Sequence, residues 1–122
     1  MNIEQYTIEE LIENIIEGIQ RKKGKEIVVL DFRKIENAVC QYFIICHANS
    51  GTQVQAISES IEEVVKQNLK ERVWHREGTD NAQWILLDYG HIVAHVFQEE
   101  YRKHYKLESL WADAKKKEIK EI

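Results

Sequence analysis

The sequence contains no proline and only two cysteines among its 122 residues. Without an X-Pro bond, no prolyl isomerisation step is expected during folding. Cys40 and Cys46 do not form a CxxC pair, which argues against a zinc site or a dithiol redox motif. So few cysteines fit a reducing compartment, and we therefore expect a cytoplasmic protein.

Long apolar runs and phosphate-binding glycine patterns are also missing. No stretch approaches the roughly 20 apolar residues that a transmembrane helix needs, and the acidic first ten residues do not resemble a signal peptide. Neither GxGxxG nor GxxxxGK[ST] occurs, so the helix start expected after Ser50 is interpreted as an ordinary capped end rather than a nucleotide site. No cofactor is expected.

The chain is highly charged but has enough apolar residues for one core. Hydrophobic residues make up 43% of the sequence, and the net charge is −4. This acidic balance argues against nucleic acid as the main partner and suits a basic protein partner. At this length we expect one domain over residues 1–114, followed by a charged C-terminal tail, 115–122, interpreted as a frayed helix.

The first helix has the clearest local signals. Thr7 and Glu10 have the spacing of a capping box, and the apolar residues from Ile8 to Ile19 fall on one helical stripe. Gly24 is the expected left-handed residue after this helix. Further elements are predicted by their apolar patterns and turn residues: strands at 26–32, 42–47 and 72–75, and a helix that begins after Ser50.

A β-hairpin is predicted from the apolar runs Trp84–Asp88 and His91–Phe97, because Gly90 between them allows the positive φ of a tight turn. Side chains alternate along strands, so one face is expected to be aliphatic core: Ile85, Leu87, Ile92, Ala94 and Val96. The other face is mixed: Trp84, Leu86, Asp88, His91, Val93, His95 and Phe97. Covering helices or a docked partner would each explain the mixed face.

The element order predicts the α/β (α+β) fold class, with a single mixed β-sheet of about five strands and helices packed on it. The passage from Tyr42 to His75 is a candidate right-handed crossover if its two strands are parallel. A charged helical segment is expected from about Gln98. Its apolar residues are predicted to pack the C-terminal turn against the sheet: Tyr105, Leu107, Leu110 and Trp111.

The sequence gives little support for a catalytic site or a metal-binding site. His91 and His95 are four residues apart on a strand, which places them about 13 Å apart and too far for one zinc ion. No serine or cysteine has the context of an activated nucleophile. Two alternatives stay open: Asp31 and Asp88, each at a strand end, holding magnesium in a nucleotidyltransferase-like enzyme, or a homodimeric interaction module.

Several blocks of the sequence carry a family pattern in order and spacing. They are Leu30-Asp31, Tyr42–Ile45, Asn49-Ser50, Gln53–Ile57, the WILLDYG segment 84–90, Val93–Phe97 and the C-terminal motif E-x-R-x-x-Y-x-L-E-x-L-W at 100–111. Together they resemble the ribosomal silencing factor family, also called RsfS or Iojap, over residues 7–114. The family usually has acids where this chain has Gln41 and His91, so any role of those acids is not carried over.

The resemblance implies a fold similar to nucleotidyltransferases without their catalytic motif, and therefore no enzyme activity. It also implies binding to the large ribosomal subunit through its protein fourteen, a basic protein on the inter-subunit face. The bound factor would block joining of the small subunit by steric exclusion and repress translation.

The hairpin pattern and the resemblance together predict partner-binding residues on the mixed face and its turn. These residues are Trp84, Leu86, Asp88, Tyr89, Val93 and His95. Trp84 is the expected anchor, because tryptophan is enriched at interface hot spots. No catalytic or metal-binding residue is expected.

Overall fold

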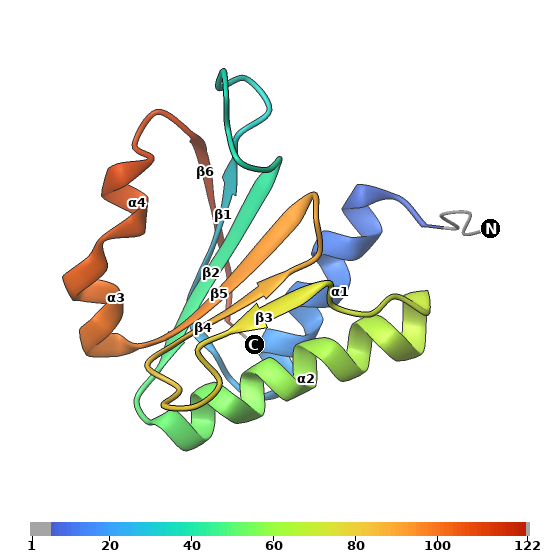
Figure 1. Cartoon of the computed structure of the whole chain (residues 1–122), viewed down its shortest axis with the longest axis vertical. Coiled ribbons are helices and arrows are strands. Elements are labelled where there is room, and N and C mark those ends of the chain that lie inside the picture. The colour runs from blue at the N-terminus through green and yellow to red at the C-terminus, as the bar shows by residue number, and fades with distance from the viewer. Residues whose placement is uncertain (1–5, 122) are drawn as a thin grey trace.

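The computed structural model describes residues 6–121, in which helices flank both faces of one sheet. Figure 1 shows α1 (Ile8–Arg21) and α2 (Gly51–Leu69) on one side, with α3 (Glu99–Tyr105) and α4 (Leu107–Leu110) on the other. The strands are β1 (Lys25–Asp31), β2 (Tyr42–Ala48), β3 (His75–Glu77), β4 (Trp84–Asp88), β5 (Ile92–Gln98) and β6 (Lys115–Ile119). The predicted α/β class is confirmed, with six strands in one mixed sheet instead of about five.

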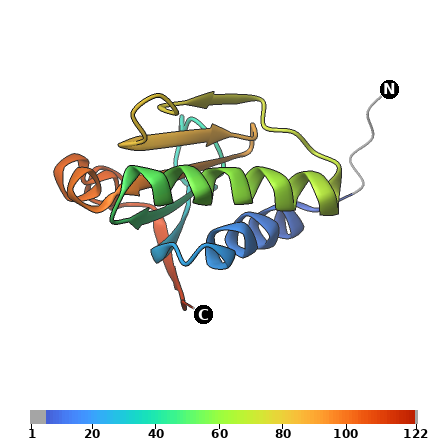
Figure 2. The ribbon, with the colours of Figure 1, turned by 90° about the horizontal axis from the view of Figure 1, so that it is seen from below.

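The strand order is β3-β4-β5-β2-β1-β6, and only β2 and β5 are parallel. The crossover predicted from Tyr42 to His75 is therefore wrong in its second strand. Since β3, β4 and β5 form an antiparallel meander, β5 is the strand that returns beside β2, and α2 lies within this longer connection. Figure 2 shows α1 and α2 side by side beneath the sheet.

The start of α1 follows the sequence prediction, whereas its end does not. The Thr7 hydroxyl accepts from the Glu10 backbone N–H and the Glu10 carboxylate accepts from the Thr7 N–H, which confirms the capping box. The left-handed residue after the helix is Lys23, not Gly24. Glycine is needed at position 24 for space instead, because a Cβ there would lie 2.4 Å from Ile19 Cγ2.

The C-terminal segment departs most from the sequence prediction. Residues 115–122 are predicted as a frayed helix, but Lys115–Ile119 forms β6, which pairs antiparallel with β1. This pairing satisfies the outer hydrogen-bonding groups of β1, and the lysines of the new edge strand discourage further edge pairing. The short strand predicted at 72–75 also shifts, to His75–Glu77, where it pairs with β4.

The sheet face beneath α1 and α2 is an aliphatic core. The two hairpin strands align without a bulge, as Ile85 lies opposite Val96 and Leu87 opposite Ala94, which confirms the predicted faces. The two helices pack closely at Gly18, where an added Cβ would lie 2.6 Å from Ile61 Cα. The buried Ser60 hydroxyl donates to the Gly18 carbonyl oxygen at this crossing.

Candidate functional site

An aromatic row crosses the opposite face of the sheet, beneath α3 and α4. Neighbouring ring centroids along it lie 4.4 to 5.8 Å apart. The row runs through Tyr105, Trp84, His95, Phe43, Phe32 and Trp111. Ring pairs of this kind each contribute about 0.5–1.5 kcal/mol beyond their buried area. This face therefore gains much of its packing from rings, beside aliphatic residues of the same core, and the row holds α3 and α4 against the strands.

A buried arginine holds α3 in place. One Arg102 nitrogen donates to the Glu26 carbonyl oxygen at 2.7 Å and to His47 Nδ1 at 2.9 Å, while two others donate to the Glu108 carboxylate. Burial lowers the pKa of His47, and the neighbouring guanidinium lowers it further, so His47 stays a neutral acceptor. Arg102 was not predicted as a structural residue, although it belongs to the E-x-R pattern of the family motif.

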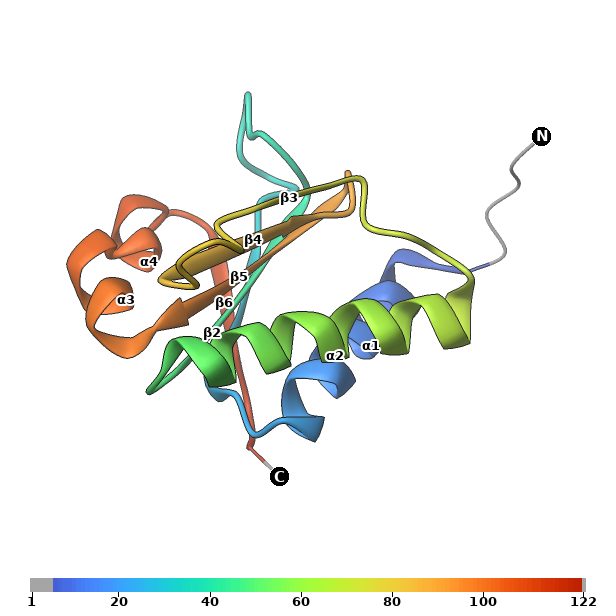
Figure 3. The same cartoon turned by 60° about the horizontal axis from the view of Figure 1, so that its bottom comes forward.

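The edge of this face beyond α3 is open to solvent. Because α3 packs on β5 and β2, the β3–β4 edge lies beyond its main contacts (Figure 3). Residues that lie opposite each other in a ladder share a face of the sheet. His75 lies opposite Asp88, and Glu77 lies opposite Leu86, so these two residues of β3 share this face with β4. We call this set the open strip: the partly buried Trp84, Leu86 and Asp88, and the exposed His75 and Glu77.

The open strip combines apolar surface with acidic groups. Glu77 Oε2 lies 2.7 Å from His75 Nε2, and both side chains are more than half exposed. Asp88 Oδ1 accepts a 2.7 Å hydrogen bond from the backbone N–H of Gly90, whose φ of +90° suits the tight turn. Asp88 therefore fixes the hairpin turn and also places an acidic group at one end of the strip.

The six predicted partner-binding residues do not share one accessible surface. Trp84, Leu86 and Asp88 lie on the open strip. Val93 and His95 face the same side but are buried, with 9% and 3% exposure. Tyr89 lies on the opposite side, buried in the aliphatic core. His75 and Glu77 were not predicted as site residues, and only the pairing of β3 with β4 reveals them.

The four residues predicted to pack the C-terminal turn also differ in their contacts. Leu107 and Trp111 pack against the core that contains the aromatic row. Tyr105 contacts the Trp84 ring and stays 46% exposed. The prediction is wrong for Leu110, which is 70% exposed. Because α4 is a single turn, only one of its sides meets the sheet, and Leu110 falls on the other.

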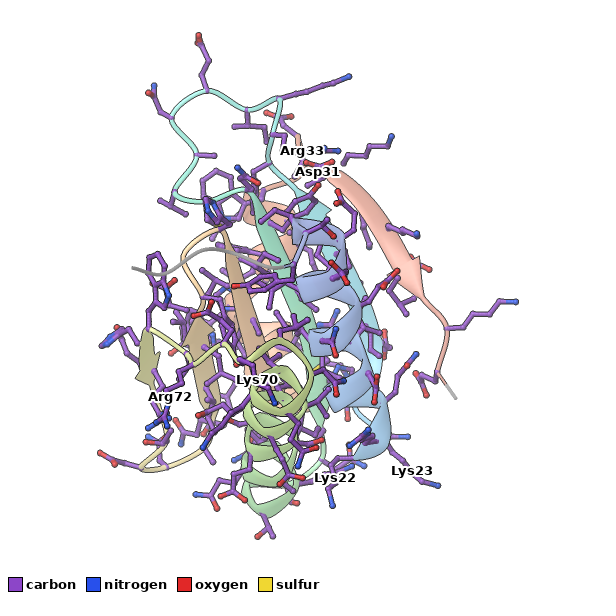
Figure 4. All side chains as sticks on the ribbon, turned by 90° about the vertical axis from the view of Figure 1, so that its right-hand side faces the viewer. Lys22, Lys23, Asp31, Arg33, Lys70 and Arg72 are labelled. Atoms are coloured by element: carbon purple, nitrogen blue, oxygen red, sulfur yellow. The ribbon has the colours of Figure 1, made fainter. Side chains whose placement is uncertain are left out.

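The structure contradicts the paired-acid alternative. Asp31 ends β1 on the α1 side of the sheet, where two Arg33 nitrogens donate to its carboxylate and hold its pKa below the usual value. Figure 4 shows this pair side by side at the end of β1. Asp88 faces the opposite side, three strand spacings away, or about 14 Å. The two carboxylates do not share a magnesium ion in this fold.

Residues 6–121 contain no cluster of three or more histidine, cysteine or acidic side chains arranged to hold a metal ion. No helix within the same residues is both long and apolar enough to span a membrane. The described residues do form a partly apolar strip with acidic groups, which the aromatic row supports from one side.

Comparison with known proteins identifies the family. Residues 5–122 match the family model described as "Ribosomal silencing factor during starvation". The chain is 35% identical over 114 residues to the ribosomal silencing factor of Halalkalibacterium halodurans, covering 93% of this chain and 96% of that protein. It is 44% identical over 93 residues to the Bacillus subtilis factor, covering 76% and 77%.

A solved structure agrees with these matches. The crystal structure of a protein from Chromobacterium violaceum superposes with a TM-score of 0.82 at 31% identity, covering 88% of each chain. A sequence match over nearly the whole chain and a shared fold lead to the same assignment. The chain belongs to the ribosomal silencing factor (RsfS) family.

Proposed function

We propose that this protein binds the large ribosomal subunit through its protein fourteen, blocks joining of the small subunit and so represses translation in the cytoplasm. Family membership supports this function as a whole. The open strip is the structural feature that supports it most, because it offers a site for a protein partner. We place the docking surface on the strip, with Trp84 and Leu86 as its apolar centre.

Charge favours a basic partner for this surface. Glu77 and Asp88 border the apolar residues, and the whole chain carries a net charge of −4. A ribosomal subunit rich in RNA repels such a chain, whereas a basic ribosomal protein attracts it and fixes its orientation. A two-fold homodimer through the strip would bring the acidic groups of one copy into the same interface as those of the other, so we favour the basic partner.

Repression then needs no chemistry at the site. A folded domain attached to the inter-subunit face occupies space that the small subunit needs for joining. Rigidity helps, because an ordered surface loses less conformational entropy on binding. The aromatic row supplies that rigidity beneath the strip, and Arg102 anchors α3, which carries Tyr105, against β1 and β2.

Sedimentation with purified subunits tests the proposal. We expect the protein to sediment with the large subunit at near-physiological salt and not with the small subunit. Glu77→Lys should weaken this binding about tenfold, which is about 1.4 kcal/mol, since it places a cation opposite a basic partner. Glu63→Lys is the matched control, because it changes the same charge on an exposed residue of α2. Equal recovery with both subunits, or with neither, contradicts the proposal.

A further inference from the structure

The most unusual contact near the open strip joins Trp84 to His95. Trp84 Nε1 donates a 3.0 Å hydrogen bond to His95 Nδ1 across the β4–β5 ladder. The indole N–H is the only polar group of a tryptophan side chain. Trp84 therefore presents an apolar ring edge to solvent, because its one donor is already bound inside the protein.

This contact also defines the state of the histidine. Because Nδ1 accepts the hydrogen bond from the indole N–H, the neutral imidazole ring carries its own proton on Nε2. Burial lowers the pKa of His95 to about 3, so the ring stays neutral at physiological pH. Among residues 6–121, Nε2 is one of two buried side-chain nitrogen or oxygen atoms without a hydrogen-bond partner, and Tyr89 Oη is the other.

If the residue at position 95 served only to fill space in the core, it would not need a ring nitrogen that accepts the Trp84 hydrogen bond. A leucine or methionine at position 95 could fill a similar volume beside Phe43 and Phe97 without burying an unpaired N–H. Such an unsatisfied donor is costly in a protein interior. The acceptor at Nδ1 is what histidine provides here and an apolar residue would not.

We propose that His95 is a positioning residue for docking, which fixes the Trp84 ring and masks its N–H so that the open strip presents a rigid, apolar anchor. Tyr105 supports the ring from α3, with centroids 4.9 Å apart, and Phe97 stacks beneath it at the same distance. The inference rests on the proposed function, since it explains how the docking surface is prepared before the partner arrives. His95 itself is buried and does not touch the partner.

Two substitutions at position 95 separate positioning from packing. His95→Asn keeps an acceptor near the place of Nδ1, whereas His95→Leu keeps the bulk and removes the acceptor. At equal folded fraction, we expect His95→Leu to bind the large subunit at least tenfold more weakly than the wild type. His95→Asn should recover most of that loss, staying within about threefold of the wild type. Equal binding by the wild type and His95→Leu overturns the inference.

The free protein gives a test that needs no variant at position 95. In spectra of the nitrogen-15-labelled protein, the indole N–H signal of Trp84 is identified by its absence in Trp84→Phe. We expect this N–H to exchange with deuterium much more slowly than that of Trp74, which is 67% exposed. Equally fast exchange of the two signals shows that the Trp84–His95 contact does not persist in solution and overturns the inference.

A double-mutant cycle covers the case in which His95→Leu folds poorly. With phenylalanine at position 84 there is no indole N–H to hold, so adding His95→Leu should change binding by less than twofold. A loss as large as in the wild-type background assigns His95 to packing alone and overturns the inference. If the wild type itself fails to bind the large subunit while the Trp84 N–H remains protected, the proposed function fails and the contact stands.

Discussion

The two faces of the sheet are built from different side chains and serve different purposes. The face beneath α1 and α2 is aliphatic and completely covered across β2, β4 and β5. The face beneath α3 and α4, which we call the ring-built face, combines the aromatic row with aliphatic residues, contains His95 and Arg102, and leaves its β3–β4 edge open. Both faces contain buried core, but only the second leaves part of its surface exposed at the sheet edge.

This contrast explains how a small domain can leave Trp84 and Leu86 partly exposed and still fold. We infer that the two buried cores hold the sheet together without closing the open strip. The substitutions below test whether stability and docking separate in this way between the two faces.

The largest expected contrast compares Ile44→Ala with Trp84→Ala. Ile44 has no exposed surface in the aliphatic core, and its truncation should cost about 2–5 kcal/mol of stability. Binding of the molecules that remain folded should be unchanged. Trp84→Ala should destabilise less, because the ring is partly exposed, but should weaken binding to the large subunit at least about 30-fold, or about 2 kcal/mol. Chemical denaturation and binding measurements on both variants check this, and similar losses in both assays for both variants would break the contrast.

The ring-built face should also make stability depend on pH. The folded-state pKa of His95 lies near 3, below the ordinary value of 6.5, so between these values the unfolded chain binds a proton that the folded chain does not. The contribution of His95 to the free energy of unfolding is therefore fully present above about pH 6.5. Below that pH it falls by about 1.4 kcal/mol per pH unit. His47 acts in the same direction. Denaturation midpoints between pH 7 and 4.5 should fall less steeply for His95→Asn, and identical slopes would contradict the prediction.

The smallest expected effect is at Leu110. This side chain is 70% exposed on α4, so Leu110→Ala should change the free energy of unfolding by less than about 0.5 kcal/mol. Leu107→Ala is the matched comparison, because Leu107 packs beside the aromatic row and should cost clearly more. Equal unfolding midpoints for the two variants would show that α4 does not pack as described.

The elements that sequence reasoning predicts well are those specified by neighbouring residues. The Thr7–Glu10 capping box and the apolar stripe of α1 are local signals, and both appear in the structure. The alternation of the hairpin is also local, and a turn without a bulge keeps its faces as predicted. The family motif adds the overall assignment, which composition and spacing alone do not supply.

Features that depend on distant partners are missed. Lys115–Ile119 contains one apolar residue and has little intrinsic strand preference, and it becomes a strand because β1 offers a free edge. Arg102 belongs to a charged helix, and its burial depends on carbonyl oxygens of β1 that lie 76 and 77 residues away in the sequence. Likewise, the burial of His95 beneath α3 separates it from the exposed strip that alternation predicts it to share.

Cross-linking from one residue on each face tests the central claim most directly. A photoreactive residue in place of Glu77 lies on the open strip, and one in place of Glu13 lies on the exposed side of α1. On purified large subunits, we expect position 77 to cross-link to ribosomal protein fourteen and position 13 to give no cross-link to that protein. A cross-link to protein fourteen from position 13 alone would contradict the assignment of docking to the ring-built face.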